Sequence, residues 1–260
     1  MKLIKTLGKF KWQLKTRIKE LLKVNRVKNH HLLTKYFTNK VGLEIGGPSK
    51  AFQSGGYISV YNKVKTLDGV NFSDTTIWTG KINAQHGFIV NKKRVGKMYI
   101  ADATALTEIE NAQYDFILSS NNIEHIANPL KAMEQWISKL KINGILVIVA
   151  PRKESNFDHK RNIVKIGHLL DDYNQDIDEC DLTHLDDILQ LHDFERDYPS
   201  SLLTFSQFKE RCLKNFEHRW MHHHCFDLKV LEQMCNYFDL KVILKEEKPS
   251  NYIIVAQKTQ

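Results

Sequence analysis

The sequence predicts an α/β protein built around a mostly parallel sheet, and three observations support this fold class. After residue 40, short apolar strand segments alternate with helical patterns, as they do where crossover helices join parallel strands. The segment 41–45 leads directly into a glycine turn, which is typical of the first strand of such a sheet. With 260 residues and 42% hydrophobic content, the chain can bury one substantial core. We therefore expect a single α/β domain with additions.

The turn after the first strand contains Gly46, Gly47 and Pro48, and Glu44 precedes it. A dinucleotide loop needs G-x-G-x-x-G with backbone amides aimed at a pyrophosphate. Here the third glycine is absent, and Pro48 has no N–H to donate. The loop therefore favours a cofactor with no phosphate to hold, and S-adenosylmethionine (SAM) is the obvious candidate.

Further expected strands also end in polar residues. Val64-Lys65-Thr66-Leu67-Asp68 places an acid about where a ribose-binding carboxylate falls in such folds. Residues 70–97 combine glycines with polar residues, so we expect a loop or small hairpin beside the cofactor. The remaining strand segments begin at Met98, Tyr114 and Lys141, and the last of them ends at Pro151.

In this order, the motifs resemble those of the class I SAM-dependent methyltransferases. The resemblance covers about residues 40–150, and segments 240–244 and 252–256 fit the antiparallel hairpin that closes that fold. It implies a Rossmann-like, seven-stranded, mostly parallel sheet flanked by helices. Residues 151–238 are too long for an ordinary connection, so we expect a helical lid or acceptor-binding insertion after the fifth strand.

Two segments resemble narrower groups of that superfamily. Ile-Glu-His-Ile-x-Asn-Pro at 123–129 is similar to the small-molecule, type 11-like branch. Phe-Asp-His-Lys-Arg at 157–161 resembles methyltransferases of bacterial surface-polysaccharide gene clusters. The resemblance implies methyl transfer to a hydroxyl or phosphate-linked group of a small acceptor. That acceptor would be a sugar or nucleotide-activated precursor of a capsule or lipopolysaccharide.

The resemblance also implies cofactor contacts at the strand ends. Glycines of the first turn would pass beneath the methionine end of SAM, with the preceding acid ordering that turn. The acid of the second strand would bind the ribose hydroxyls, and the third strand's acid and the next amide would meet the adenine edge. Asparagines after the fourth strand would lie beside the methyl group. In this sequence the residues are Glu44, Gly46, Gly47, Asp68, Asp102, Ala103, Asn121 and Asn122.

A hydroxyl acceptor benefits from a general base, and His125 has the right intrinsic pKa for this role. Asp158 and His159 are the second candidates, because ligands of open α/β sheets bind beyond the strands' carboxyl ends. Arg161 could clamp a phosphate or carboxylate of the substrate. An ordinary surface position is the alternative for Arg161, and orientation or packing is the alternative for His125.

The insertion is rich in histidine and aspartate, which together are metal-ligand residues. His168, His184 and His223 are candidates for a polar pocket that binds the acceptor. Some methyltransferases hold a divalent ion with Glu-x-x-Glu-His plus a remote histidine, and this chain has Asn121 at the first of those positions. A metal is therefore not favoured. The weak candidate ligands are Glu124, His125, His222 and His224.

The net charge of +8 belongs to an N-terminal arm. Residues 1–40 hold twelve Lys or Arg against Glu20 alone, which leaves the rest of the chain at about −3. Apolar residues within 1–24 recur at helical spacing opposite lysines, so residues 1–39 should form a basic amphipathic helical arm before a 40–260 methyltransferase domain. The arm could pack on the domain or rest on anionic lipid. Nucleic acid is an unlikely partner without a basic groove on the body.

Other functional classes are disfavoured by the same sequence. The four cysteines lack C-x-x-C spacing, which indicates reduced thiols. No run approaches 18 apolar residues, the length that would predict a membrane-spanning helix. We therefore expect a cytoplasmic enzyme, peripheral at most to the inner face of the cell membrane. Asn128-Pro129-Leu130 lacks the Pro-Pro-aromatic motif of nucleic-acid methyltransferases, and the first loop disfavours a nicotinamide dehydrogenase. A non-catalytic, membrane-associated SAM-binding protein is the remaining alternative.

Overall fold

Seven strands form the central sheet of the protein, in a computed structural model that describes residues 25–76, 80–198 and 200–260. Most of these strands are rich in buried apolar residues, as expected where both faces of a sheet are covered. The strands are β1 (Val41–Ile45), β2 (Thr66–Asn71), β7 (Met98–Ile100), β8 (Tyr114–Ser120), β9 (Leu140–Pro151), β10 (Lys241–Glu247) and β11 (Asn251–Gln257).

The strand order in the sheet is β10-β11-β9-β8-β1-β2-β7. β1 pairs in parallel with β2 and β8, and β11 runs antiparallel to both of its neighbours. The expected seven-stranded, mostly parallel sheet with a closing hairpin is confirmed. The order reverses between β1 and β8, and ligands of open α/β sheets bind at such a point, beyond the strands' carboxyl ends.

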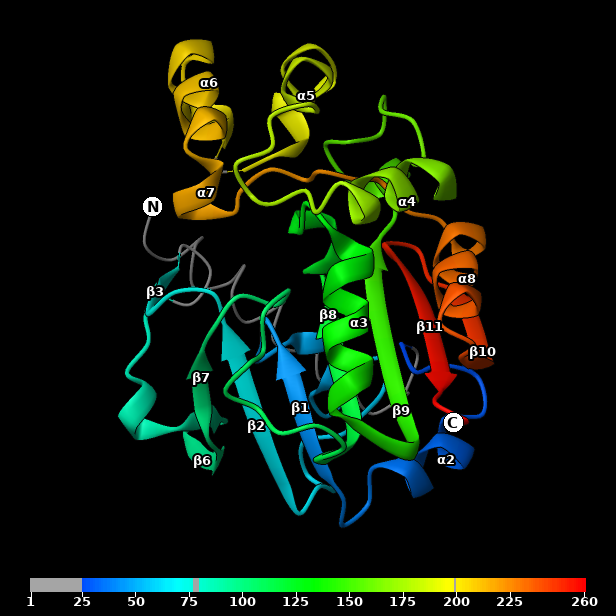
Figure 1. The fold of residues 1–260 in the computed structure, drawn as a ribbon. Helices are drawn as coiled ribbons and strands as arrows, with labels where there is room; N and C mark the ends of the chain where they lie inside the picture. Colours follow the sequence, from blue (N-terminus) through cyan, green and yellow to red (C-terminus); the bar gives the residue numbers. More distant parts are fainter. Residues whose placement is uncertain (1–24, 77–79, 199) are drawn as a thin grey trace, which may run out of the picture.

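Side chains alternate across the sheet, so each strand contributes to two cores. On β9, Leu146 and Ile148 join one apolar cluster, whereas Val147 and Val149 join the other. Figure 1 shows α3 (Pro129–Lys139) and α8 (Leu228–Tyr237) covering the first of these faces. Their apolar residues recur at three- and four-residue steps, and Trp136 is fully buried there.

Capping residues begin both flanking helices. The Asn128 side chain accepts a hydrogen bond from Lys131 N at 3.0 Å, and Pro129 occupies the first turn of α3. Asp227 caps α8 in the same way through Val230 N at 2.8 Å. Such side chains satisfy N–H groups that have no partner within the helix. Because α8 packs on β10 and β11, it belongs to the layer that flanks the sheet.

The second face is covered by the segment 27–61. Its short elements are α2 (His30–Leu33) and the 3₁₀ turns η1 (Thr34–Tyr36) and η2 (Lys50–Phe52). Phe37 and Phe52 are fully buried, and Phe37 meets Phe116 of β8 edge to face at 5.2 Å. The described end of the expected N-terminal arm is therefore part of the core.

Two small hairpins lie at the edge of the sheet within residues 75–76 and 80–96, where a loop or small hairpin was expected. The first pairs β3 (Thr75–Thr76) with β4 (Gly80–Lys81), and the second pairs β5 (Phe88–Val90) with β6 (Lys93–Gly96). The 3₁₀ turn η3 (Ala84–His86) joins them.

The segment between β9 and α8 forms a helical lobe, defined here as residues 152–226. Figure 1 shows α5, α6 and α7 of this lobe above the carboxyl ends of the parallel strands. Ile188, Phe208, Cys212 and Met221 form a separate small core within it. Its elements are η5 (Lys153–Ser155), α4 (Ile166–Asn174), α5 (Leu185–Leu191), η6 (Phe194–Arg196), η7 (Ser200–Leu202), α6 (Phe205–Leu213) and α7 (Asn215–His218).

The expected amphipathic helix of residues 1–24 lies outside the described residues. Within the described part of the chain, no helix is both long enough and apolar enough to cross a membrane.

Candidate functional site

A cavity of about 220 Å³ opens at the carboxyl edge of the sheet, between β1 and its neighbours. We call it the strand-edge cavity. The ends of β1, β2, β7 and β8 and the turn η4 (Ile123–His125) supply most of its wall, and the lobe supplies two charged residues. Its lining includes Gly46, Pro48, Ser49, Asn71, Phe72, Asp102, Ala103, Asn121, Asn122, His125, Glu179 and Arg219.

Gly46 occupies the floor of the turn after β1, with φ of +75°. L residues with a side chain rarely adopt this conformation. A Cβ there would also lie 2.7 Å from Asn122 Oδ1. Gly46 N donates to Val70 O of β2 at 2.9 Å, which fixes the turn against the sheet. The turn can hold this shape only with a glycine at position 46.

Glu44 lies beneath the turn and does not line the strand-edge cavity. Its Oε1 accepts hydrogen bonds from Ser49 N at 2.9 Å and from the Tyr61 hydroxyl at 3.0 Å. A Cβ on Gly47 would lie 2.3 Å from Glu44 Cδ, so glycine lets the turn approach this carboxyl. Burial raises the pKa of Glu44 to about 8, although both hydrogen bonds oppose the shift. Glu44 and Gly47 therefore shape the turn on the side that faces away from the cavity.

The expected ribose contact of Asp68 needs correction. Asp68 lies inside β2, where its carboxylate accepts hydrogen bonds from Lys97 N at 2.7 Å and from the Tyr114 hydroxyl at 2.8 Å. It is buried and does not line the cavity. β2 continues three residues further, so Asn71 and Phe72 occupy the position expected for Asp68.

Asp102 and Ala103 line the cavity, as expected for the third strand end. Oδ1 of Asp102 accepts from the backbone N and the hydroxyl of Thr104 at 2.8 and 2.7 Å. Arg219 from the lobe donates to Oδ2 at 2.7 Å. Burial opposes ionisation of Asp102, but these hydrogen bonds and the guanidinium charge outweigh it and lower its pKa. The carboxylate therefore remains charged at neutral pH.

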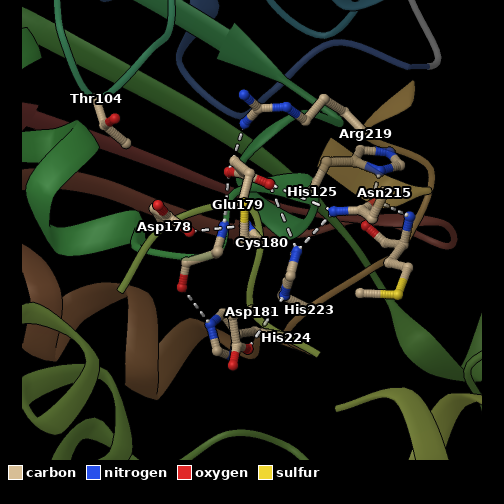
Figure 2. Close-up of polar contacts among 12 residues, drawn as sticks. Thr104, His125, Asp178, Glu179, Cys180, Asp181, Asn215, Arg219, His223 and His224 are labelled. Carbon is tan, nitrogen blue, oxygen red and sulfur yellow. Dashed lines mark hydrogen bonds and ion pairs between the residues drawn. The ribbon is translucent and has the colours of Figure 1, made fainter. Parts of the chain in front are cut away.

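Sequence reasoning missed Glu179 and Arg219, which both line the strand-edge cavity. Figure 2 shows Arg219, Asn215 and His223 converging on Glu179. Arg219 Nη1 lies 2.8 Å from Glu179 Oε1, and Asn215 Nδ2 lies 3.4 Å from Oε2. Ala127 N also donates to Oε1, at 3.0 Å. No local motif marks these residues, because their relation to the cavity exists only in the folded chain.

A second cavity of about 810 Å³ lies between the sheet edge and the lobe. We call it the lobe cavity. Asn121 and His125 line both cavities. The lining of the lobe cavity also includes Glu124, Phe157, Asp158, Tyr198, Phe208, Arg211, Trp220, Met221, His222, Ser250 and Asn251.

His125 occupies the last position of η4, in the wall shared by the two cavities. Its Nδ1 lies 3.1 Å from the backbone carbonyl of Met221. A carbonyl only accepts, so Nδ1 carries the proton and Nε2 has the lone pair. Burial and the nearby His222 lower the pKa of His125 well below its ordinary value. The imidazole is therefore neutral and able to accept a proton.

Asp158 lines the lobe cavity and forms an ion pair with His222, whose Nδ1 lies 2.5 Å from Oδ2. Burial opposes ionisation of Asp158, but His222 and Arg161 lower its pKa to about 2. The same pairing raises the pKa of His222 in spite of its burial. The rings of His222 and His125 meet edge to face at 4.5 Å. Asp158 therefore acts on His222 and is not itself a ready base.

Arg161 is buried within the lobe and lines neither cavity. Its guanidinium donates to Asp187 at 2.7 Å, to Asp158 at 3.0 Å and to the carbonyls of His222 and His223 at 2.7 and 3.0 Å. The expected clamp on substrate is corrected to a structural role, because these acceptors occupy its donors. Arg161 fixes the segment that carries His222.

His159 also lines neither cavity. Its Nε2 lies 2.7 Å from Asp193 Oδ2, which joins η6 to the segment after β9. The expected catalytic role of His159 is therefore corrected to a lobe contact. Its neighbour Asp158 lines the lobe cavity, although both residues lie in the same turn after η5.

Glu124 is buried beside His125 and His222, and burial raises its pKa to about 7 while His222 opposes the shift. The ligand atoms of these three residues all lie within 4.8 Å of one another. The weak metal candidates therefore divide into two groups, since His224 lies in a different cluster with His168, Asp172 and His184.

His168, His184 and His223 line neither cavity, in contrast to the expected acceptor pocket. His223 is buried in the Glu179 network, with its Nε2 3.0 Å from Asn215 Nδ2. His168 and His184 meet each other through their Nε2 atoms at 3.1 Å. His223 is buried within the lobe, whereas His168 and His184 are only partly buried.

The strand-edge cavity fits a nucleoside cofactor without phosphates. Pro48 offers no amide donor at the turn, and a Cβ at position 46 would fill the space beneath Asn122. Asp102 and the amide of Ala103 are polar groups suited to an adenine edge, and Phe72 offers an apolar surface. His125 adds a neutral imidazole at the wall that this cavity shares with the lobe cavity. This arrangement suits transfer of a small group from one cavity to the other.

Comparison with known proteins agrees with this chemistry. Residues 27–198 match the family model described as a methyltransferase domain. No curated protein sequence matches the chain.

Similar solved structures include three methyltransferases. A SAM-dependent methyltransferase from Methanosarcina mazei is 15% identical, with 87% of this chain and 96% of that chain covered and a TM-score of 0.46. The N-methyltransferase NodS from Bradyrhizobium japonicum is 13% identical, with 90% and 96% covered and a TM-score of 0.46. A SAM-dependent methyltransferase from Aquifex aeolicus is 12% identical, with 88% and 89% covered and a TM-score of 0.44.

Proposed function

The chain belongs to the methyltransferase-domain family and is a SAM-dependent enzyme, and from this premise we propose that its acceptor is a sugar or a nucleotide-activated sugar. The methylated group is a hydroxyl or phosphate-linked group on a precursor of a bacterial capsule or lipopolysaccharide. One observation carries the proposal: Asn121 and His125 line both the strand-edge cavity and the larger lobe cavity. In this proposal the methyl group passes between the two cavities at this shared wall.

SAM, when bound, supplies a methyl group on a sulfonium that is already activated, so positioning the acceptor does much of the catalytic work. Asn121 is itself held in place, because Asn251 Nδ2 donates to its Oδ1 at 2.9 Å. The backbone of Asn121 has φ of +48° and donates to Val149 O at 2.8 Å. The shared wall is therefore rigid on the side of the sheet.

His125 takes the proton of the acceptor hydroxyl in this proposal. Its low pKa keeps the ring neutral at the pH of the cell, and the Met221 carbonyl selects the tautomer with the lone pair on Nε2. A positioned general base typically contributes about 10²–10⁴-fold to the rate. The Asp158–His222 ion pair stands next to this ring and fixes its surroundings.

The lobe cavity has the mixed lining that a sugar needs. Phe157, Phe208 and Trp220 contribute aromatic rings to its lining, which also contains serine and asparagine residues. The Arg211 guanidinium stacks on the Trp220 ring at 3.7 Å and donates to Ser200 Oγ at 2.9 Å. Arg211 replaces Arg161 as the cation proposed to meet a phosphate of the acceptor.

The test is the formation of S-adenosylhomocysteine in the presence of single candidate nucleotide-sugars and their free sugars. We expect turnover with a member of this class, a loss of about 10²–10⁴-fold in kcat for His125→Ala and no loss for His31→Ala, an exposed control on α2. Arg211→Gln should raise the KM for nucleotide-sugars more than that for free sugars. SAM binding without turnover of any such acceptor would contradict the proposal.

The basic N-terminal segment extends the proposal to a membrane surface. Residues 1–24 carry most of the excess positive charge of the chain, and each lysine near an anionic surface contributes about 1 kcal/mol to binding. Deleting residues 1–24 should abolish co-sedimentation with anionic vesicles and leave turnover of a soluble acceptor nearly intact. Unchanged co-sedimentation would place lipid contact elsewhere, and unfolding of the truncated protein would assign the segment to the core.

A further inference from the structure

Four side chains inside the lobe lie in a cluster separate from both cavities. His168 and Asp172 occupy one face of α4, four residues apart. His184 immediately precedes α5, and His224 lies in the segment before α8. The four candidate ligand atoms, one from each residue, all lie within 4.8 Å of one another. Three segments that are distant in sequence therefore present nitrogen and oxygen atoms to one point.

Three of the distances in this cluster are close to those of a tetrahedral metal site, and all four candidate atoms lie within 4.8 Å of one another. His168 Nε2 lies 3.1 Å from His184 Nε2, and Asp172 Oδ2 lies 3.5 Å from His168 Nε2 and 3.5 Å from His224 Nε2. Ligands about 2.0–2.1 Å from a zinc ion at the corners of a tetrahedron are ~3.3–3.4 Å apart. The observed separations bracket this value.

One buried oxygen of the cluster lacks the hydrogen bond that such an atom normally accepts. Asp172 Oδ2 is buried and has no hydrogen-bond partner within the described part of the chain. A buried carboxylate oxygen without a donor is costly, and such atoms usually indicate an ion or water. Two imidazole nitrogens lie near it, at a distance too long for a good hydrogen bond. A cation between these atoms would satisfy the oxygen.

We propose that His168, Asp172, His184 and His224 bind one Zn²⁺ ion as a structural site. Three imidazoles and one carboxylate suit zinc better than Mg²⁺ or Ca²⁺, which prefer oxygen ligands. Four protein ligands leave no open position for substrate, and none of them lines either cavity. The ion joins α4, the start of α5 and the segment after α7. His168 and His184 are only partly buried, which gives the ion access.

A hydrogen-bonded cluster without metal is the competing arrangement. In that case one of His168 and His184 donates to the other, and His224 Nε2 donates to Ala127 O at 3.2 Å. Zinc would instead require His224 Nε2 to give up its proton. The two arrangements therefore differ in metal content, and each predicts a different result on chelation.

The experiment uses the full chain, stripped with chelator and titrated with Zn²⁺ and, separately, with Co²⁺. We expect one metal ion per chain, the visible absorption of tetrahedral Co²⁺ and a rise in Tm of about 5–10 °C at a free concentration of 100 times Kd. Asp172→Asn and His184→Ala should each weaken binding by more than ~100-fold, since even a lost outer partner costs ~10–100-fold. These readouts do not require methyl transfer.

Matched controls separate this site from its neighbours. Asp171→Asn changes the exposed aspartate next to Asp172 on α4, and His218→Ala removes a half-exposed histidine of the same lobe. Both should bind zinc like the wild type. Failure to bind stoichiometric metal, or equal binding by Asp172→Asn and His184→Ala, overturns the site. Zinc that is lost in Glu124→Gln but kept in His184→Ala would place the ion in the lobe cavity and overturn it as well.

Discussion

Arg219 Nη2 lies 2.7 Å from Asp102 Oδ2, although 117 positions separate the two residues. Asp102 stands at the end of β7, and Arg219 follows α7 in the lobe with φ of +54°. The same guanidinium contacts Glu179, a buried residue of the lobe. Arg219 therefore links the lobe to the strand-edge cavity, whose wall also includes Glu179.

Arg219→Ala should loosen the lobe. Its removal leaves the buried Glu179 carboxylate without its closest cation, and a hydrogen bond to a charged group contributes about 1.5–3 kcal/mol. Amide hydrogen exchange in residues 176–198 and 200–222 should therefore become about 10–100-fold faster. Arg196→Ala removes a half-exposed arginine whose ion pair with Asp193 is 3.7 Å long, and it should leave exchange unchanged. Equal exchange in both variants would contradict the coupling.

Asp68→Ala should mainly lower stability, whereas Asp102→Ala should mainly lower the affinity for SAM. Asp68→Ala leaves the buried Tyr114 hydroxyl and the part-buried Lys97 N without their acceptor. The loss for the buried hydroxyl alone costs about 1–3 kcal/mol of stability, with little direct effect on SAM affinity. Asp102→Ala should weaken SAM binding by about five- to hundredfold, because a hydrogen bond is worth about 1–3 kcal/mol. Thermal unfolding and calorimetry with SAM measure the two effects. If folded Asp68→Ala loses more SAM affinity than Asp102→Ala does, Asp68 would be reassigned to the ribose contact.

Glu44 should make stability depend on pH. Its pKa rises from the ordinary 4.5 to about 8 in the folded protein, so the folded state keeps a proton that the unfolded state loses. This contribution is complete below about pH 4.5 and is lost as pH rises to about 8, by a few kcal/mol in total. In Glu44→Gln, which keeps an acceptor for Ser49 N, this decline should disappear. Parallel pH profiles of unfolding free energy for both proteins would contradict the assignment.

His125 should set the acidic limb of the rate profile. A base acts in its deprotonated form, and burial lowers the pKa of His125 well below 6.5. The kcat should therefore not fall through protonation of this residue between pH 8 and 6.5, and its limb should appear at lower pH. His125→Ala should lower kcat by about 10²–10⁴-fold with SAM affinity nearly unchanged. If His125→Ala keeps a normal kcat, the role of general base would be reassigned to His222, which is paired with Asp158.

The strands could be predicted wherever an apolar run ends at a polar or glycine residue. This holds for β1, β7, β8 and β9, and the closing hairpin was also expected. β2 differs, because Gly69 directly follows Asp68 and glycine in a sequence favours the end of a strand. In the structure a Cβ at Gly69 would lie 2.2 Å from the Phe88 ring. That close contact explains the glycine within the strand and moves the strand end from Asp68 to Asn71.

Residue type alone could not assign the charged groups of the lobe. Arg161 and Arg211 are both arginines after β9, yet one is surrounded by carboxylates and carbonyls and the other faces the lobe cavity. His159 and Asp158 are adjacent, yet only Asp158 of this pair lines that cavity. The difference depends on packing between distant segments, which spacing along the chain does not reveal.

The place of β11 between β9 and β10 has a consequence for biosynthesis. β9 and β10 are both translated before β11, so a nascent chain exposes the apolar edge of β9 until its partner emerges from the ribosome. Such an unpaired edge is a site of aggregation. Ser250 and Asn251, which complete the wall of the lobe cavity, arrive with the same strand. Enzymatic competence should therefore begin only after β11 has inserted, and chaperone dependence should be greatest just before that moment.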